Sequence, residues 1–352
     1  MTTAAYNETR ESPSQFCWRV LPNVSRSFAA VIRQLPPGAA EAVMVSYLLC
    51  RIADSIEDSS LATGEKQARL RRLPAQMEGQ SAAPEFLLDS VAAIYRELLS
   101  RPDAVFDCYR ALDPEARAAI LKCVEEMCDG MAEWTARTIE TIADQDRYCY
   151  YVAGVVGKLL TELFRIYEMV SPALAAELAK RAVQFGLALQ KVNILRDVRA
   201  DAHEGRCYWP QALMRAHVLA PKTLFDPAHT ATAVLVLNDL VADALPYFGA
   251  AMEYIEVLPT TQPRLRSFCA IPLFMATATA RVCCGNPDVL LADEPVKISR
   301  REARSIVLRC RLLGWSNAYL RRWYRAEIRT LVASLSRGGS AELTPLVSSA
   351  PE

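Results

Sequence analysis

Apolar residues recur along this chain at the three- and four-residue spacing of amphipathic helices, in stretches of about 15 to 30 residues. Ala, Leu, Arg and Glu, which are strong helix formers, dominate these stretches, and the alternation typical of strands is nearly absent. Proline and glycine separate the stretches, at Pro36-Pro37-Gly38, Pro102, Pro114, Pro172, Pro210, Pro221, Pro259 and Pro287. The pattern predicts an all-α protein of roughly a dozen helices.

One large domain is expected over residues 15–335. The chain has 352 residues, of which 52% are apolar and only 13 are glycine, and this is enough for a sizeable buried core. Segments 1–14 and 336–352 are rich in polar and small residues, so we expect them to be flexible termini. We find no internal repeat with a period of about 20 to 50 residues.

Charge and cysteine content exclude several classes of protein. The chain carries 40 basic and 40 acidic residues, a balance that gives no indication of nucleic-acid binding. Its 11 cysteines are scattered through apolar stretches without a CxxC pair, which indicates buried thiols in a reducing compartment. With only 3 histidines, the chain favours a hard metal bound by oxygen over a histidine site.

The N-terminal residues are polar and lack the apolar segment of a signal peptide, so we expect a cytoplasmic protein. The longest nearly uncharged run, 268–280, is shorter than the roughly 20 residues of a membrane span. Residues 300–329 contain nine arginines interleaved with Leu, Trp and Tyr. Such a segment can lie on an anionic bilayer, or it can be a terminal helix packed on the domain with a solvated basic face.

A first acidic cluster, Asp54-Ser-Ile-Glu57-Asp58, lies inside an apolar helical pattern. Tyr47, Arg51, Asp54 and Asp58 follow one another at helical spacing and share one stripe. Mg²⁺ commonly joins one or two protein carboxylates to phosphate oxygens. Arg51, one turn upstream, can contact a diphosphate oxygen. A solvated helix end is the alternative interpretation.

A second polar stripe consists of Gln190, Asn193, Asp197 and Asp201, at spacings of three, four and four residues on an otherwise apolar helix. If the two acidic helices face each other, up to five carboxylates surround one pocket. Their mutual repulsion is tolerable only with metal ions between them. The two clusters together therefore favour a Mg²⁺ and diphosphate site over a structural role.

A third segment, 148–157, combines tyrosines with small residues. Tyr148, Val152 and Val156 are four residues apart, and Gly154 and Gly157 allow close approach of another helix. Tight helix packing alone is the alternative explanation for the glycines. Beside an apolar cavity, Tyr148 can stabilise a cation with its ring or handle a proton with its hydroxyl.

Two further segments offer contacts to phosphate. Ser25-Arg26-Ser27-Phe28 provides two hydroxyls and a cation, although Ser25 or Ser27 can equally cap a helix. Arg206, just past the second acidic cluster, adds another cation.

These segments occur together as SRSF at 25–28, LLCRIADSIED at 48–58, YCYYVAGVVG at 148–157, LQKVNILRDVRAD at 189–201, GRCYWP at 205–210 and FCAIP at 268–272. In this order, over about residues 20 to 315, they resemble the squalene/phytoene synthase family. The resemblance implies a single isoprenoid synthase domain, with helices around a central cavity. FCAIP followed by PVKI at 295–298 is more similar to the squalene synthases of that family than to its phytoene synthases.

The resemblance also implies a reaction and a set of site residues. Two farnesyl diphosphates would condense head to head to presqualene diphosphate, which NADPH would reduce to squalene after ionisation and rearrangement. The implied Mg²⁺ ligands are Asp54, Glu57, Asp58, Asp197 and Asp201. The implied catalytic residues are Tyr148, Arg51, Asp54, Asp58, Asp197 and Asp201. The implied substrate contacts are Ser25, Arg26, Ser27, Phe28, Tyr47, Arg51, Val152, Val156, Gln190, Asn193 and Arg206. The implied NADPH contacts are Arg26, Arg51, Asn193, Arg196, Lys297 and Arg300.

Three departures from the family pattern concern the details. Ala200 stands where the second acidic motif usually has Glu, and Ser299 interrupts the basic stretch between Lys297 and Arg300. The membrane-spanning C-terminus of eukaryotic squalene synthases is missing, which suggests a bacterial, soluble or peripheral enzyme.

A phytoene or dehydrosqualene synthase without the reductive step, or another prenyltransferase of this fold, is the alternative function. A non-catalytic family member is less compatible with five of the six expected acids being present. The sequence predicts no particular oligomeric state.

Overall fold

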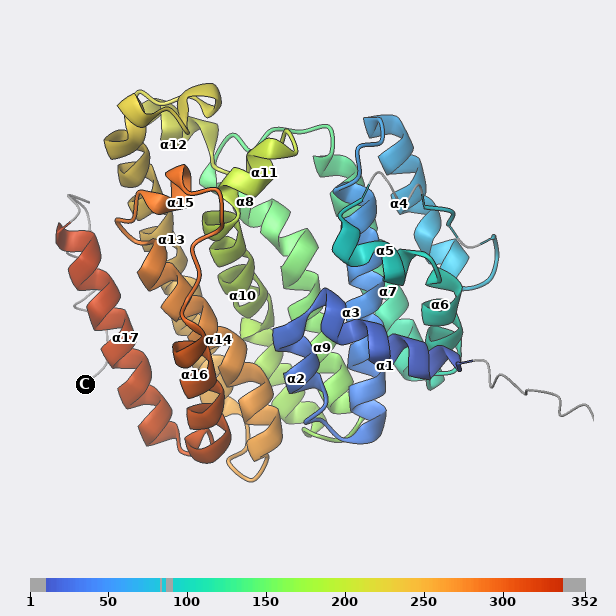
Figure 1. The fold of residues 1–352 in the computed structure, drawn as a ribbon. Helices are drawn as coiled ribbons and strands as arrows, with labels where there is room; N and C mark the ends of the chain where they lie inside the picture. Colours follow the sequence, from blue (N-terminus) through green and yellow to red (C-terminus); the bar gives the residue numbers. More distant parts are fainter. Residues whose placement is uncertain (1–10, 83, 87–90, 338–352) are drawn as a thin grey trace, which may run out of the picture. The chain divides into compact units, whose positions relative to one another are not determined.

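The computed structural model describes residues 11–82, 84–86 and 91–337, apart from the side chains of Arg26 and Ser27. Among these residues the regular structure is entirely helical, which confirms the predicted all-α class (Figure 1). The helices form two compact units, Met1–Glu125 and Glu126–Glu352, with the boundary inside α7 (Pro114–Trp134). The single domain over 15–335 stays a prediction.

The first unit is organised around α3. Its other helices are α1 (Pro13–Val24), α2 (Arg26–Ile32), α4 (Thr63–Met77), η2 (Ala93–Tyr95), α5 (Arg96–Leu99) and α6 (Pro102–Arg110). Of the 21 residues of α3 (Pro37–Glu57), 14 are buried, because α1, α2, α4, α5 and α6 all pack on it. Burial on this scale leaves few partly exposed positions on α3, and Arg51 and Asp54 are two of them.

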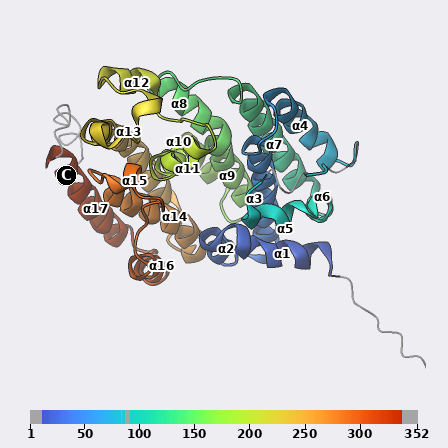
Figure 2. The ribbon, with the colours of Figure 1, turned by 45° about the horizontal axis from the view of Figure 1, so that its top comes forward.

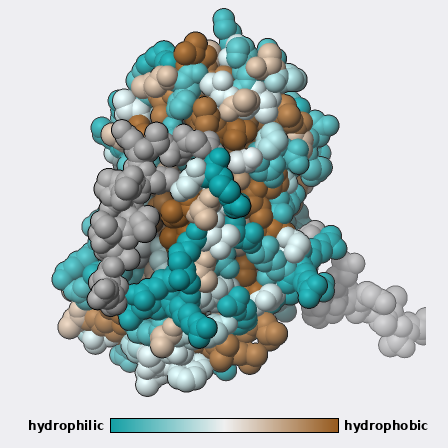
Figure 3. All heavy atoms as spheres, turned by 90° about the vertical axis from the view of Figure 1, so that its left-hand side faces the viewer, coloured by the Kyte–Doolittle hydropathy of each residue, from teal (hydrophilic) through white to brown (hydrophobic). Residues whose placement is uncertain are grey.

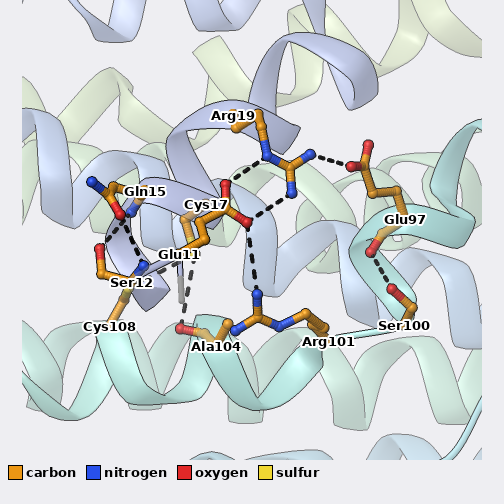
Figure 4. A network of polar contacts seen from close by, with 10 residues as sticks. All are labelled: Glu11, Ser12, Gln15, Cys17, Arg19, Glu97, Ser100, Arg101, Ala104 and Cys108. Atoms are coloured by element: carbon orange, nitrogen blue, oxygen red, sulfur yellow. Dashed lines mark hydrogen bonds and ion pairs between the residues drawn. The ribbon is translucent and has the colours of Figure 1, made fainter. Parts of the chain in front are cut away.

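Polar contacts fix α1 within the first unit (Figure 4). Ser12 and Gln15 form a reciprocal capping box at the start of the helix. Arg19 binds both Glu11 and Glu97, and Glu97 lies on α5. On the buried side, the Sγ atom of Cys17 contacts α6. These contacts fix α1, and with it the start of α2, in the unit that contains α3.

The second unit contains a longer series of helices. They are α8 (Ile142–Cys149), η3 (Tyr150–Gly154), α9 (Val155–Ile166), α10 (Pro172–Arg196), α11 (Val198–His203), α12 (Gln211–Ala216), η4 (Pro221–Thr223), η5 (Pro227–His229), α13 (Thr230–Val257), α14 (Pro263–Cys283), α15 (Asp288–Leu291), α16 (Arg300–Leu313) and α17 (Asn317–Arg337). In both views of the ribbon α10 lies between α9 and α13, and it packs on both (Figures 1 and 2). The C-terminal end of α10 carries the second acidic cluster.

The predicted helix breaks at proline are largely confirmed. Pro102, Pro114 and Pro172 are each the first residue of a helix, where a missing N–H costs nothing. Proline is not a sufficient signal, however, because Pro246 and Pro272 lie inside α13 and α14. Those helices continue through proline because tertiary packing outweighs one lost hydrogen bond.

The small residues of segment 148–157 serve close packing against α10. A Cβ atom added at Gly157 would lie 2.0 Å from the carbonyl oxygen of Ala182. One added at Gly186 would lie 2.2 Å from the carbonyl oxygen of Ala153. The backbones therefore touch at distances that only glycine permits, which supports the packing explanation for these glycines.

One segment among the described residues, Pro227–Val257, is long and apolar enough to cross a bilayer by length and composition. It includes α13, which packs on α10 and α14 within the second unit. Core helices of soluble proteins meet the same criterion, so this segment carries little weight as a membrane span.

Arg266 is a fully buried cation that joins the ends of three helices. Its Nε donates to the Gly314 carbonyl oxygen at 2.8 Å, and its Nη1 donates to the carbonyl oxygens of Ile255 at 2.8 Å and Leu258 at 2.5 Å. Its Nη2 bonds the side chain of Asn317. Burial lowers the pKa of Arg266, but the guanidinium still satisfies carbonyls that have lost their helical partners.

We therefore expect Arg266→Met to lower the free energy of unfolding by about 2 to 4 kcal/mol, because several buried acceptors lose their donors. The exposed neighbour Arg264 provides the control, and Arg264→Met should change stability by less than about 0.5 kcal/mol. Urea unfolding of the two variants measures the difference. Equal midpoints would show that Arg266 does not join these helices.

Candidate active-site residues

The first acidic cluster lies at the C-terminal end of α3. Asp58 is the C-cap residue, and Asp54 lies one turn before it with a half-buried side chain. Carboxylates are disfavoured at a helix C-terminus, where the helix dipole is negative. The structure thus places two acids where nearby cations are needed to stabilise them.

Arg51 is the cation that the structure provides for this cluster. Its Nη1 lies 3.2 Å from Oδ2 of Asp54, and its guanidinium lies 5.0 Å from the ring centroid of Tyr95 and 6.0 Å from that of Tyr47. Burial raises the pKa of Asp54, and Arg51 partly offsets the rise. The Nε of Arg51 is buried without a hydrogen-bond partner. An acceptor such as a diphosphate oxygen would satisfy it.

The other predicted site residues of the first unit differ in burial and in the contacts they make. The side chain of Glu57 is buried, unlike those of Asp54 and Asp58. Ser25 caps α2 by accepting a hydrogen bond from the Phe28 N–H at 3.3 Å, which supports the capping interpretation for that hydroxyl. The ring of Phe28 lies 5.6 Å from that of Tyr47. The side chains of Arg26 and Ser27 lie outside the described residues.

The second stripe is not one continuous helix, so that prediction is wrong. α10 ends at Arg196, Asp197 is its C-cap residue with φ −96° and ψ 7°, and α11 begins at Val198. Asp197 and Asp201 are nevertheless still one helical turn apart, because the Asp201 N–H donates to the Asp197 carbonyl oxygen at 2.9 Å. Both acidic clusters therefore place a carboxylate at the C-cap of a long buried helix.

Arginines accompany the second pair of acids as well. Arg196 forms an ion pair with Asp197, and Arg206 lies 3.9 Å from Asp201 while it also binds Glu204. Burial lowers the pKa of Arg196, but its contact with Asp197 raises it overall. One turn earlier on α10 the amides of Asn193 and Gln190 bond each other at 3.3 Å. Each unit thus holds a pair of carboxylates with arginine beside it.

Tyr148 belongs to a row of aromatic rings that the sequence did not reveal. Its buried ring stacks on Tyr208 with centroids 4.6 Å apart, and Trp134 meets it edge-on at 6.2 Å. Tyr208 lies in the GRCYWP segment, so its place beside Arg206 was the available signal. Nothing in the sequence pattern singled out Trp134.

The segment after Tyr148 forms a π-helix, η3, instead of continuing as an α-helix. Tyr148, Val152 and Val156 therefore lie on three successive elements, α8, η3 and α9, where the spacing predicted one regular α-helix. Val152 and Val156 are half-buried. Single π-turns inside α-helices often occur at functional sites, since they re-aim side chains.

Lys297 and Arg300 are both exposed in the described structure. Ser299, the departure between them, caps α16 by accepting a hydrogen bond from the Glu302 N–H at 3.1 Å. A cavity of about 260 Å³ lies next to this segment, and two arginines and two acids are among the residues that line it: Arg196, Arg199, Ala200, His203, Glu204, Val289, Ala292, Asp293 and Pro295. Ala200, which replaces the usual glutamate, therefore lines a cavity of mixed charge.

Within the described residues, no three His, Cys, Asp or Glu side chains form a group that fits a metal ion. Each unit does offer two carboxylates one helical turn apart, and oxygen ligands of this kind match the preference of Mg²⁺ for one or two protein carboxylates. The donor chemistry therefore fits Mg²⁺ joined to a phosphate group. The predicted pocket of five carboxylates stays a prediction.

Comparison with known proteins extends this picture. The squalene/phytoene synthase family matches residues 21–302. Squalene synthase of Schizosaccharomyces pombe is 35% identical over 86% of this chain and 67% of its own length. Squalene synthase of Rattus norvegicus is 33% identical over 83% of this chain and 68% of its own. Squalene synthase LSS of Botryococcus braunii is 33% identical, but the match spans only 62% of that protein.

Solved structures agree with these matches. A complex of TcSQS with the ligand BPH1237 superposes with a TM-score of 0.81 at 30% identity, and the match covers 93% of this chain and 98% of that one. A dehydrosqualene synthase superposes with a TM-score of 0.61 at 24% identity over 88% of this chain, which shows a shared fold. The helical isoprenoid synthase architecture expected from the sequence is thereby confirmed.

Proposed function

The chain belongs to the squalene/phytoene synthase family, and from that membership we propose that it is a squalene synthase. It condenses two farnesyl diphosphates to presqualene diphosphate and converts this intermediate to squalene with NADPH. The squalene synthases of Schizosaccharomyces pombe and Rattus norvegicus, which it resembles over most of its length, support this choice over a phytoene synthase. The single observation that carries the chemistry is that each acidic cluster ends a buried helix and has an arginine beside it.

Asp54 and Asp58 in the first unit, and Asp197 and Asp201 in the second, would hold Mg²⁺, with Glu57 as a further ligand. When bound, Mg²⁺ stabilises the negative charge that develops on a departing diphosphate. Carboxylates paired with arginine suit this task, because the arginine offsets part of the cost of holding negative charge there before the metal binds.

Arg51 and Arg206 would bind diphosphate oxygens. Both already lie beside an acidic cluster, and the Nε of Arg51 is buried without a partner, so an incoming diphosphate would add an acceptor that the protein lacks. Ser25, Arg26, Ser27 and Gln190 would complete the polar contacts to substrate. Charge-assisted contacts of this kind hold the leaving group in place during ionisation.

The farnesyl chains would contact apolar and aromatic side chains, with Phe28 and Tyr47 in the first unit and Val152 and Val156 in the second. Tyr148 would act at the carbocation that ionisation creates. Its ring is stacked and buried, so its face and hydroxyl have a fixed direction, as cation stabilisation or proton transfer requires.

NADPH would bind near the cavity that Arg196 lines, next to Asp197. Arg196 and Pro295 both line that cavity, which brings together the two sequence segments expected to contact the cofactor. Asn193, Lys297 and Arg300 would add polar contacts, as would Arg26 and Arg51. Guanidinium and ammonium groups are natural partners for the phosphates of NADPH.

Product analysis tests the proposed function. Purified protein with farnesyl diphosphate and Mg²⁺ should form squalene only when NADPH is added, and presqualene diphosphate or derived alcohols without it. A C20 diphosphate offered alone should be converted poorly. Dehydrosqualene from the C15 substrate, or phytoene from the C20 substrate, would instead identify the non-reductive alternative. Failure to consume either diphosphate would defeat the proposal.

We also propose that the enzyme is cytoplasmic and touches the membrane through α16 and α17. All 11 cysteines are free thiols, as expected in a reducing compartment. Four large apolar side chains are exposed around the α16–α17 turn, and we call them the apolar tip: Leu308, Leu312, Leu313 and Trp315. Figure 3 shows that the side carrying α17 is mixed, with bands of hydrophilic side chains between hydrophobic ones, and α17 itself includes several exposed arginines. An anionic bilayer would match both features.

Replacing Trp315 and Leu312 together with serine should lower binding to anionic vesicles roughly tenfold or more, because two exposed apolar side chains that would enter the lipid are lost. Val218 is 89% exposed and lies far along the chain from the apolar tip, so Val218→Ser is the control and should not change binding. Vesicle co-sedimentation at low and high salt measures the effect. No binding of the unaltered protein at either salt concentration would refute the membrane contact.

A further inference from the structure

Lys191 of α10 is a buried cation that the proposed chemistry does not use. Its side chain is 2% exposed, and its Nζ lies 2.6 Å from Oδ1 of Asp146 and 2.5 Å from Oδ2 of Asp243. Burial lowers the pKa of Lys191, but the two carboxylates raise it overall, so the ammonium stays charged. Since Asp146 lies on α8 and Asp243 on α13, this one cation ties three helices together.

The third acceptor of the ammonium is the side-chain amide of Gln145, a residue of α8. The Nζ of Lys191 donates to Oε1 of Gln145 at 3.1 Å. Because the amide oxygen must face the ammonium, the amide nitrogen points the other way. There it donates to the main-chain carbonyl oxygen of Tyr208 at 2.9 Å. Lys191 thereby fixes the orientation of an amide that holds the 204–210 loop.

That loop carries two groups of the candidate site. The ring of Tyr208 stacks on Tyr148 at 4.6 Å with an angle of 19° between the planes, and Arg206 lies two residues earlier. A loop held by few contacts has many conformations, so a buried hydrogen bond to its backbone narrows them. Gln145 is itself 2% exposed, which makes this contact hard for water to replace.

We propose that Gln145, oriented by Lys191, is a positioning residue for Tyr148. It fixes the carbonyl of Tyr208, so that the Tyr208 ring packs flat on the Tyr148 ring and sets the direction of the phenol. This role rests on the proposed function insofar as Tyr148 acts on the substrate. The loop contact itself does not depend on which substrate is bound.

Gln145→Met tests this role, because methionine fills a similar volume but neither accepts from Lys191 nor donates to Tyr208. Tyr247→Phe is the matched control. The Tyr247 hydroxyl donates to Oδ2 of Asp146 at 2.7 Å, so this variant removes a hydrogen bond from the same buried cluster without touching the 204–210 loop. Comparable losses of stability are expected from the two changes.

In single turnover at saturating farnesyl diphosphate, Gln145→Met should lower the rate on the order of 10²-fold, as misplaced catalytic groups do. KM should change by less than about threefold, and Tyr247→Phe should keep a rate within about threefold of the unaltered protein. Tyr208→Phe, which keeps the stacked ring, should be active, whereas Tyr208→Leu should resemble Gln145→Met. Equal rates for Gln145→Met and Tyr247→Phe would overturn the proposal.

Hydrogen exchange separates this outcome from failure of the proposed function. Amides of 204–210 should exchange faster in Gln145→Met than in Tyr247→Phe, whatever the substrate. If the unaltered protein does not consume farnesyl diphosphate, the proposed function is refuted. The hydrogen-exchange comparison then still tests whether Gln145 positions the 204–210 loop. Unchanged exchange in Gln145→Met would refute the positioning role even in an active enzyme.

Discussion

Replacing Asp54 with asparagine should lower the turnover of farnesyl diphosphate on the order of 10³-fold, comparable to the loss of a main transition-state contact. Asparagine has nearly the same shape but carries no charge, so it is a weak ligand for Mg²⁺. Burial already raises the pKa of Asp54, and a cation beside it favours the ionised carboxylate at the end of α3. Steady-state kcat with Mg²⁺ and NADPH measures the loss.

Asp107 is the matched control for this substitution. It pairs with Arg110 at 2.5 Å across a three-residue helical spacing, as Asp54 pairs with Arg51, but it lies exposed on α6. Asp107→Asn should keep full activity. Thermal midpoints of both variants should stay within about 1.5 °C of the unaltered protein, which corresponds to roughly 1 kcal/mol for a chain of this length. Full activity of Asp54→Asn would refute its assignment as a metal ligand.

Asp201→Asn should have an effect of similar size in the second unit, again on the order of 10³-fold in kcat. With Ala200 in place of the usual glutamate, this cluster keeps only two carboxylates, so the loss of one leaves a single ligand. Asp201 is also the more enclosed of the two, with a side chain 18% exposed against 31% for Asp197.

Glu204 provides the control for Asp201, because both acids contact the same arginine, Arg206. Glu204 is exposed, and nothing assigns it to a metal. Glu204→Gln should therefore keep activity within about threefold of the unaltered enzyme. Equal losses of activity in the two variants would mean that any negative charge beside Arg206 has the same effect. Asp201 would then not be a specific metal ligand.

The sequence predicted the class of fold because local signals and burial agreed. Helix formers fill the stretches between prolines, and Pro102, Pro114 and Pro172 begin helices as expected. Periodicity could not show where tertiary packing overrides proline, as at Pro246, where α13 continues because it is packed on α10 and α14.

The candidate site was predicted in composition more than in geometry. Carboxylates in apolar helices were a visible signal, but regular spacing implied one helix through Asp197 and one α-helical face after Tyr148. The chain instead bends at Asp197 and forms a π-helix over Tyr150–Gly154, and neither feature changes residue spacing. Lys191 was visible as a lysine among apolar residues of α10, yet its partners come from segments roughly 50 residues away.

The most direct test of the central proposal is diphosphate release from farnesyl diphosphate by the unaltered protein, Asp54→Asn and Asp201→Asn, each with Mg²⁺ and with a chelator. We expect rapid release only from the unaltered protein with Mg²⁺, because each unit contributes carboxylates that the ionisation needs. Release at the unaltered rate from either variant, or from the unaltered protein without a divalent ion, would contradict the assignment of these carboxylates.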